Sequence, residues 1–191
     1  GKLTFKNCNV LATNFFVRMA KNGTGAEVNF DNCTVVTKVV DTMFLLTTDS
    51  CGTININDTS LTTTIGWNGD HIGNSTLFNT TNNKDITINV TGTSVLNGAA
   101  TGNSPYCGII VASPTGAVTM NLDSTATLRL AGSGTHKIDN RFTFDYYNAQ
   151  VVLNGSPKLE ISAEMARQGV HLPVLHDTGK IAVDYVPSTG K

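Results

Sequence analysis

The side chains that could do chemistry gather in three long loops, residues 62–76, 97–106 and 131–141. The loops fall at the same place in consecutive repeats, so we expect them to project side by side on one flank. Aromatic rings give flat apolar surfaces, and charged or planar polar groups beside them supply hydrogen bonds. This combination suits sugar rings and other extended polar ligands, and loops on a rigid scaffold often carry binding sites. The candidate ligand-binding residues are Trp67, Asp70, His71, Tyr106, His136, Lys137, Asp139 and Arg141.

Two of these assignments have an alternative. Trp67 is the only tryptophan, and it either contacts a ligand or packs on the scaffold as a lid. His71 and His136 would form a metal-binding or pH-sensitive pair if their loops touch, but two loop histidines are more often simply solvated. We therefore assign no metal site.

Motifs of known catalytic sites are absent from the sequence. It contains no GxSxG, no HExxH and no phosphate-binding loop. The best candidates for a catalytic group are Asp139, Arg141 and Asp145. A solvated loop with a local ion pair explains these three residues better. We assign no catalytic residue and no cofactor. The other acids considered are Asp70, Asp85 and Asp123.

The composition excludes several classes of protein. Of 191 residues, 20 are Asn and 28 are Thr, only 14% are charged, and the net charge is -1. Asn, Thr and Gly disfavour helix interiors, so a helical bundle is excluded. A hydrophobic content of 40% argues against disorder. A pI near 6.4 argues against a nucleic-acid partner.

A repeated segment dominates the sequence. Each copy alternates apolar and polar residues, which predicts a strand with one buried face. The second inward-facing apolar residue of each copy serves as its anchor. The anchors are Phe5, Phe30, Ile56, Ile88, Met120 and Leu153, at intervals of 25, 26, 32, 32 and 33 residues. The six copies are LTFKNCNV (3–10), VNFDNCTV (28–35), ININDTSL (54–61), ITINVTGTSVL (86–96), VTMNLDSTATLRL (118–130) and VVLNGSPKLEI (151–161).

A further strand is expected before each copy from the second onward. No repeat has enough apolar residues to fold alone, whereas stacked repeats bury a continuous column. A β-sandwich also has many short strands, but it does not explain one pattern that returns at nearly constant intervals. The sequence predicts an all-β fold, a right-handed parallel β-helix (β-solenoid) of about six coils. The further strands are 15–19, 43–46, 76–79, 108–111 and 142–146.

The position after each inward anchor predicts a polar ladder. Four stacked asparagines at one bend would hydrogen-bond along the axis and tolerate left-handed backbone angles. The alternative is that asparagine simply favours turns. The residues at this position are Lys6, Asp31, Asn57, Asn89, Asn121 and Asn154.

The four cysteines lack the spacing and the histidines of a zinc site. Cys8 and Cys33 fall at equivalent positions of the first two copies, so about 4.8 Å should separate them. That distance permits a disulfide, and stacked thiols fit at least as well. Cys51 and Cys107 are out of register with each other and are expected to be free.

Residues 162–191 differ in character from the repeats. Residues 162–169 have a serine N-cap and a closing glycine, which predicts a short helix. Residues 172–176 and 180–186 are strand candidates. We expect residues 1–161 to form the β-helix, truncated at its N-terminal end because Gly1 leads directly into a strand, and residues 162–191 to cap the core.

The FxNCxV and IN-type repeats, the Asn- and Thr-rich strands, the low charge and the capped tail resemble the pectate-lyase-like adhesive domains of Gram-positive cell-surface proteins, Lactobacillus-type adhesins in particular. The resemblance covers roughly residues 1–161. It implies an extracellular, wall-anchored adhesin that is a monomer within a larger surface protein. Its β-helical head would bind host glycans or extracellular matrix protein without catalysis. The family supplies no binding motif, so the candidate residues rest on the loops.

Two other functions stay open. Parallel β-helices also carry polysaccharide lyases and hydrolases, so an enzyme acting on a pectin-like or other acidic glycan is the alternative. A structural stalk that only spaces other domains is the third hypothesis. The sequence has no apolar run long enough to span a bilayer, and we expect no membrane contact by this segment.

Overall fold

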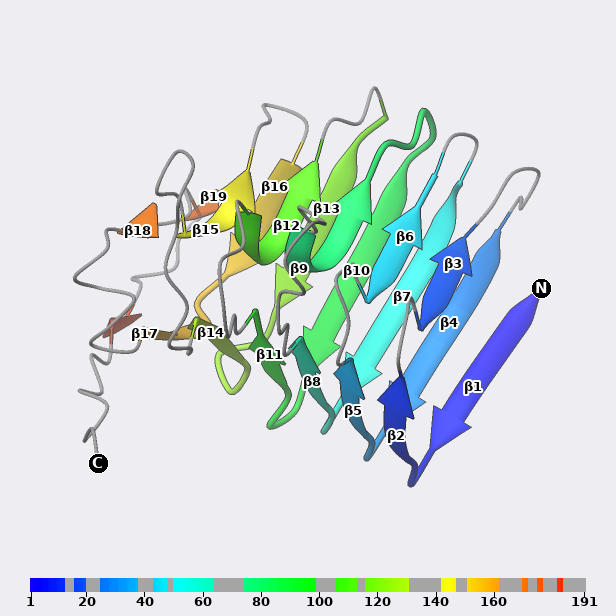
Figure 1. The fold of residues 1–191 in the computed structure, drawn as a ribbon, viewed down its shortest axis with the longest axis horizontal. Helices are drawn as coiled ribbons and strands as arrows, with labels where there is room; N and C mark the ends of the chain where they lie inside the picture. Colours follow the sequence, from blue (N-terminus) through cyan, green and yellow to red (C-terminus); the bar gives the residue numbers. More distant parts are fainter. Residues whose placement is uncertain are drawn as a thin grey trace, which may run out of the picture.

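The chain winds through three parallel sheets, A, B and C, in a computed structural model (Figure 1). Strands that neighbour one another in a sheet come from successive turns of the chain, and they pair in parallel. The chain is therefore a parallel β-solenoid, as the repeats predict. The residues that the structure describes are 1–12, 16–19, 25–37, 43–47, 50–63, 74–98, 106–112, 116–130, 142–146, 151–161, 170–171, 175–176 and 182–183.

Each coil contributes a strand to sheet A, then one to sheet B, then one to sheet C. Sheet A contains β1 (Lys2–Lys6), β4 (Ala26–Asp31), β7 (Gly52–Asn57), β10 (Ile86–Thr91), β13 (Val118–Leu122), β16 (Val151–Gly155) and β19 (Leu175–His176). Sheet B contains β2 (Asn9–Ala12), β5 (Thr34–Thr37), β8 (Ser60–Thr63), β11 (Val95–Asn97), β14 (Thr127–Leu130), β17 (Lys158–Ile161) and β20 (Ala182–Val183). Sheet C contains β3 (Val17–Met19), β6 (Phe44–Leu46), β9 (Asn74–Thr80), β12 (Tyr106–Ala112), β15 (Phe142–Tyr146) and β18 (Val170–His171).

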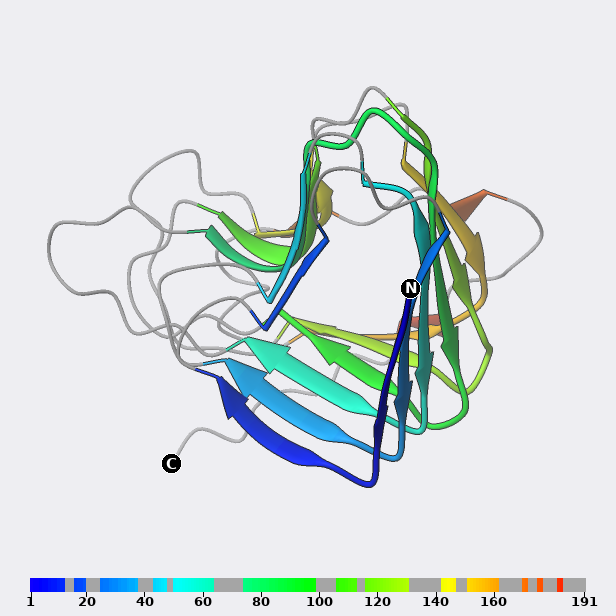
Figure 2. The same cartoon turned by 90° about the vertical axis from the view of Figure 1, so that its right-hand side faces the viewer.

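Alternate residues of the strands face inward and form one continuous core. In β4, Val28 and Phe30 are buried, and the residue between them is half-buried. Rings stack from coil to coil, with centroid separations of 5.0 Å between Phe5 and Phe30 and 4.8 Å between Phe44 and Phe78. The end view of Figure 2 shows the three sheets surrounding this interior.

The register of the third and fourth coils differs from the one that the spacing predicts. The first three anchors stack as expected, but Ile56 pairs with Val90, and Ile88 pairs with Ile54. The predicted step from Ile56 to Ile88 is therefore wrong by two residues. A shift of two keeps every side chain on the same face of its strand, so alternation alone cannot detect it.

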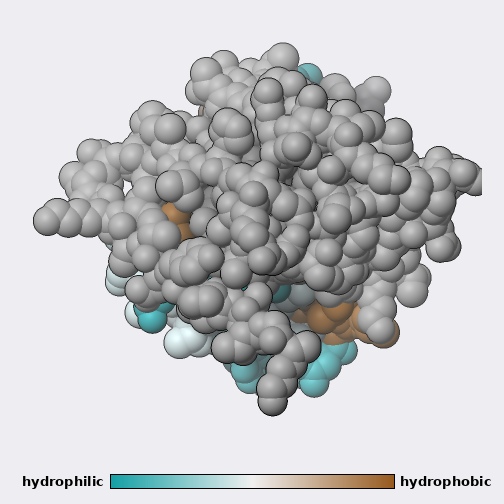
Figure 3. Space-filling model, turned by 60° about the vertical axis from the view of Figure 1, so that its left-hand side comes forward, coloured by the Kyte–Doolittle hydropathy of each residue, from teal (hydrophilic) through white to brown (hydrophobic). Residues whose placement is uncertain are grey.

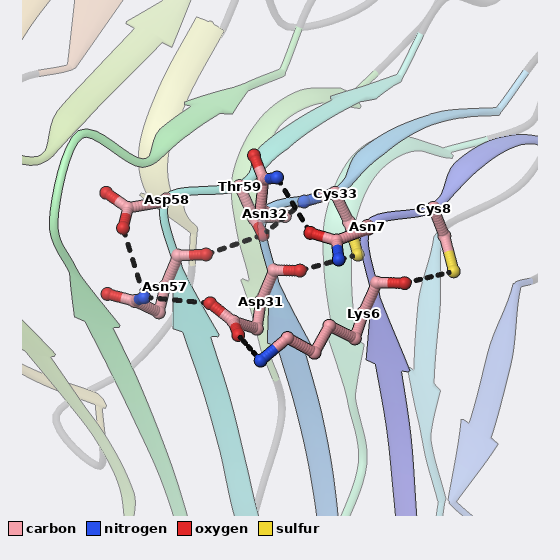
Figure 4. Close-up of polar contacts among 9 residues, drawn as sticks. All are labelled: Lys6, Asn7, Cys8, Asp31, Asn32, Cys33, Asn57, Asp58 and Thr59. Atoms are coloured by element: carbon pink, nitrogen blue, oxygen red, sulfur yellow. Dashed lines mark hydrogen bonds and ion pairs between the residues drawn. The ribbon is translucent and has the colours of Figure 1, made fainter.

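The bend between sheets A and B is what fixes this register. One residue in each of the first four coils adopts the left-handed conformation there, with φ of 53° at Asn7, 53° at Asn32, 46° at Asp58 and 65° at Gly92. Asn, Asp and Gly tolerate this region best. Figure 4 shows the bends of the first three coils in a row, with Asn32 Nδ2 donating to Asn7 Oδ1 at 2.8 Å.

The asparagine ladder exists, but it runs along the middle of the strands and not at the bend. Asn57 is not a member, because its Nδ2 donates to Asp31 Oδ1 at 3.1 Å. The members, called the amide ladder below, lie on the outer face of sheet A: Asn29, Asn55, Asn89, Asn121 and Asn154.

Cys8 and Cys33, at the bend between sheets A and B, are unbonded thiols. Cys8, Cys33 and Cys51 form no disulfide, and Cys107 lies in β12 without a described side chain. Cys8 Sγ donates to the Lys6 carbonyl at 3.1 Å and Cys33 Sγ to that of Asp31 at 3.3 Å. Of the two readings of Cys8 and Cys33, the structure has stacked thiols.

The tail continues the winding of the solenoid. β18 pairs with β15, β19 with β16, and β20 with β17, all in parallel. β19 and β20 lie inside the two predicted strand segments. The predicted helix, residues 162–169, lies outside the described residues, and the capping role of the tail stays a prediction.

Candidate functional site

The three long loops occupy the same junction of successive coils, between sheet B and sheet C. They connect β8 to β9, β11 to β12 and β14 to β15, and these strands are neighbours in their sheets. Tyr106 is the first residue of β12, where its backbone pairs with Asn74. The other candidate residues lie outside the described residues: Trp67, Asp70, His71, His136, Lys137, Asp139 and Arg141. Whether their side chains converge stays a prediction.

The outer face of sheet A is the polar surface that the structure describes best. Its strands present three columns of outward residues, because alternate positions point away from the core. The first column contains Glu27, Thr53, Thr87 and Thr119, which pair in register from strand to strand. The amide ladder is the second column. The third column consists of Lys6, Asp31, Asn57, Thr91 and Asp123.

The amide ladder is a directed chain of hydrogen bonds. Nδ2 of Asn89 donates to Asn55 Oδ1 at 2.8 Å, and Nδ2 of Asn121 donates to Asn89 Oδ1 at 2.8 Å. Nδ2 of Asn154 continues the chain to Asn121 Oδ1 at 2.9 Å. A side-chain amide has two N–H donors and an oxygen with two lone pairs, and the ladder uses one of each. Asn89 and Asn121, in the middle of the ladder, therefore each retain a donor and an acceptor for another molecule.

Ion pairs on the first two coils hold two carboxylates in the charged form. Lys2 Nζ lies 3.0 Å from Glu27 Oε1, and Lys6 Nζ lies 3.1 Å from Asp31 Oδ2. The hydrogen bond from Lys2 lowers the pKa of Glu27. Hydrogen bonds from Asn57 and then Lys6 lower the pKa of Asp31 (Figure 4).

A groove of about 400 Å³ opens on sheet A where β10, β13 and β16 reach the bend. We call it the amide groove, since three rungs of the ladder line it. Gly155 lets β16 approach β13 closely at the groove. Its φ is 111°, and a Cβ there would clash with the carbonyl of Leu122. The groove is lined by the polar residues Asn89, Thr91, Asn121, Asp123 and Asn154, by Gly155, and by the apolar residues Val90 and Leu122.

Asp123 brings a negative charge to the amide groove. Its Oδ1 accepts a hydrogen bond from the Thr125 backbone N–H at 3.1 Å and from Ser124 Oγ at 3.3 Å. The backbone hydrogen bond from Thr125 is the main cause of the lowered pKa of Asp123. An ionised carboxylate accepts hydrogen bonds only, so the groove combines one strong acceptor with amides that donate and accept.

The acids considered as catalytic candidates do not meet in the described part of the chain. Asp85 Oδ1 accepts the backbone N–H of Ala117 at 3.0 Å, which is a loop contact. Asp145 lies in β15 without a described side chain, and Asp70 and Asp139 lie outside the described residues. Within the described ranges, no three or more His, Cys, Asp or Glu residues form a metal-binding group.

The sequence contains a signal for the amide groove outside the three loops. Thr-x-Asn occurs at the same outward positions in three successive sheet A strands, as Thr53 with Asn55, Thr87 with Asn89 and Thr119 with Asn121. Both residues of each pair point outward, so the three pairs predict a polar face that repeats from coil to coil. Two further parts of the groove, Thr91 and Gly155, become apparent only when the bend is known.

The side of the solenoid that carries the C-terminal coils comes forward in Figure 3. The few described residues in sight there include both hydrophilic and hydrophobic ones. Among the described residues, no helix has the length and apolar character that a membrane crossing requires.

Comparisons with protein-family models, with curated proteins and with solved structures found no match to this chain. The fold assignment therefore rests on the geometry of the structure: parallel sheets, stacked rings and the amide ladder.

Proposed function

We propose that this protein is a non-catalytic recognition module that binds an extended glycan along the outer face of its solenoid. The observation that carries the proposal is the amide groove, where three amides and one ionised carboxylate line a volume of about 400 Å³. Sugar hydroxyls both donate and accept hydrogen bonds, and the free donor and acceptor of Asn89 and of Asn121 match them.

The periodicity of the face supports a polymer as ligand. Strands of a sheet repeat about every 4.8 Å, so the rungs offer the same contacts at regular intervals along the axis. A chain of sugar units can use several such rungs at once, whereas a compact ligand contacts only one or two. Because hydrogen bonds along the ladder already order the amides, binding loses little side-chain entropy.

The predicted loops at the junction of sheets B and C are a second contact in this proposal. Trp67 would stack on a sugar ring, and Asp139 and Arg141 would bind hydroxyl or acidic groups. The resemblance of the repeats to adhesive domains supports an extracellular, wall-anchored setting, with host glycans or matrix protein as partners. The alternative is a polysaccharide lyase or hydrolase acting on an acidic glycan.

A glycan array read with two ladder variants tests the groove. Asn121→Ala and Asn55→Ala each interrupt the same ladder, but only Asn121 lines the groove. We expect Asn121→Ala to lose glycan binding by roughly tenfold or more, and Asn55→Ala to keep it. Equal binding by both variants, or equal loss in both, would assign the binding to another surface.

The loops and the enzymatic alternative need separate experiments. Trp67→Ala, tested on the same array, loses binding if the loops contact the ligand. No binding by wild type to any glycan or matrix protein would favour the stalk hypothesis. Pectins would be assayed for reducing sugars or unsaturated products, with and without calcium. Turnover would contradict the recognition module and favour the enzymatic alternative.

A further inference from the structure

The amide groove contains a carboxylate that none of the described residues neutralises with a positive charge. Asp123 is exposed beside the bend, and its Oδ1 accepts hydrogen bonds from the Thr125 backbone N–H and from Ser124 Oγ. Both donors are neutral, and no Lys or Arg among the described residues forms an ion pair with Asp123. The negative charge is therefore available to a ligand that lies in the groove.

Asp31 shows how a carboxylate in the same column is neutralised. Asp31 and Asp123 both belong to the third column on the outer face of sheet A. Lys6, in the coil before Asp31, places its Nζ 3.1 Å from Asp31 Oδ2, and Asn57, in the coil after it, donates to Oδ1 at 3.1 Å. The neighbours of Asp31 therefore supply a cation and an amide donor.

The equivalent neighbours of Asp123 carry no charge. Thr91 takes the place of the lysine in the preceding coil, and its Oγ1 donates to Asn57 Oδ1 at 3.0 Å. Ser156 takes the place of the amide in the following coil. Lys158, the lysine of that following coil, lies on β17 of sheet B and forms no ion pair with Asp123. The carboxylate in the groove therefore lacks the cation that the first two coils provide.

The groove as a whole is negative. Its described lining contains no Lys, Arg or His, and the amides of Asn89, Asn121 and Asn154 are neutral. Asp58, at the bend two coils earlier, is a second carboxylate without a Lys or Arg partner among the described residues, and its Oδ1 accepts hydrogen bonds from Thr93. A positively charged ligand is therefore attracted to the groove, and a negatively charged ligand is repelled.

We propose that the amide groove selects a glycan whose sugars carry a free amino group over neutral and acidic glycans. This assignment of a sugar class rests on the proposed function, because it concerns the same groove. The protonated amino group of one sugar lies against the carboxylate of Asp123, as Lys6 Nζ lies against Asp31. Hydroxyl groups of that sugar and of the next one bind the free donors and acceptors of Asn89 and Asn121.

The carboxylate in the groove keeps its charge under conditions in which amino sugars are protonated. Hydrogen bonds, chiefly from the Thr125 backbone N–H, lower the pKa of Asp123 below its ordinary value of 3.8. At a mildly acidic pH, the carboxylate and the amino groups of the ligand are therefore both charged. A hydrogen bond between charged groups is stronger than one between neutral groups. Acetylation of the amino groups removes their charge, so it should weaken binding.

Three oligosaccharides of equal length test the sugar class: oligomers of glucosamine, of N-acetylglucosamine and of galacturonic acid. In calorimetry at low ionic strength, we expect wild type to bind the glucosamine oligomer at least about threefold tighter than the acetylated one, and the acidic one most weakly. Asp123→Asn should abolish this preference, because asparagine keeps the oxygen that Ser124 and Thr125 bind but loses the charge. Asp31→Asn, the same substitution in the same column outside the groove, is the matched control and should retain the preference.

Asn121→Ala separates the sugar class from the proposed function. If Asn121→Ala abolishes glycan binding but Asp123→Asn leaves the preference unchanged, the groove binds glycans and the amino-sugar class is wrong. The class is also wrong if wild type shows no preference for the glucosamine oligomer, or if trilysine, a cationic peptide, competes for the groove equally well. If wild type binds no glycan, or if Asn121→Ala leaves the binding of every glycan unchanged, both proposals fail.

Discussion

Nδ2 of Asn89 donates a hydrogen bond to Oδ1 of Asn55 at 2.8 Å, across two successive coils. The spacing of the repeats would instead place Asn89 beside Asn57. This contact follows from the register of β7 and β10, and it continues the amide ladder into the groove that we propose as the glycan site.

Loss of one rung in the middle of the ladder should destabilise the fold. Asn89→Ala removes the hydrogen bonds to Asn55 and from Asn121. We expect the free energy of unfolding to fall by about 1–2 kcal/mol, measured by urea denaturation. Thr87→Ala is the control, because Thr87 faces outward on the same strand but is not in the ladder. An equal loss in the control would mean that the ladder adds nothing beyond strand propensity.

Two glycines with positive φ should differ in their tolerance of alanine. At Gly52 a Cβ would clash with the backbone of Ala26, whereas at Gly25 it meets nothing within 4 Å. Gly25→Ala should therefore cost only the strain of its backbone angle, about 1–2 kcal/mol. Gly52→Ala should cost about 1–3 kcal/mol more, from overpacking. Thermal or urea unfolding that ranks them equally would contradict the close approach of β7 to β4.

Acid should weaken the first coils through Asp31. Its pKa is lowered in the folded protein, so between that value and the ordinary one, 3.8, the unfolded chain binds more protons. The stabilisation is complete above the ordinary pKa and is lost as the pH falls through the folded one. We expect Asp31→Asn to be less stable than wild type near about pH 7, and the difference to shrink below about pH 4. If the difference in stability between wild type and Asp31→Asn stays the same at every pH, the role of Asp31 is contradicted.

The two stacked cysteines should differ in reactivity as free thiols. Cys33 is 4% exposed, whereas Cys8, in the first coil, is half-buried. Under native conditions iodoacetamide should modify Cys8 faster than Cys33, and in denaturant the two rates should become similar, as read by peptide mass spectrometry. A Cys8–Cys33 disulfide in the native protein would contradict the thiol assignment.

Much of the fold was predictable because the solenoid repeats a local pattern. Alternation around Phe30 predicts the buried face of β4, and the recurrence of that pattern predicts parallel stacking. The register from Ile56 to Val90 was not predictable in this way, since a shift of two residues leaves the alternation unchanged. The site was less accessible than the fold. The loop residues around Trp67 were chosen by chemical type, and their convergence stays a prediction.

The sequence by itself determined which side chains face inward, because strand geometry assigns alternate residues to opposite faces. It also determined a scaffold with few charges, whose Asn and Thr residues decorate the outside. Only the tertiary structure decided which asparagines meet. That choice depends on where each coil bends, and stacking the left-handed residues Asp58 and Gly92 fixes it. The amide groove follows from the same stacking, since it is made by residues that are distant in the chain.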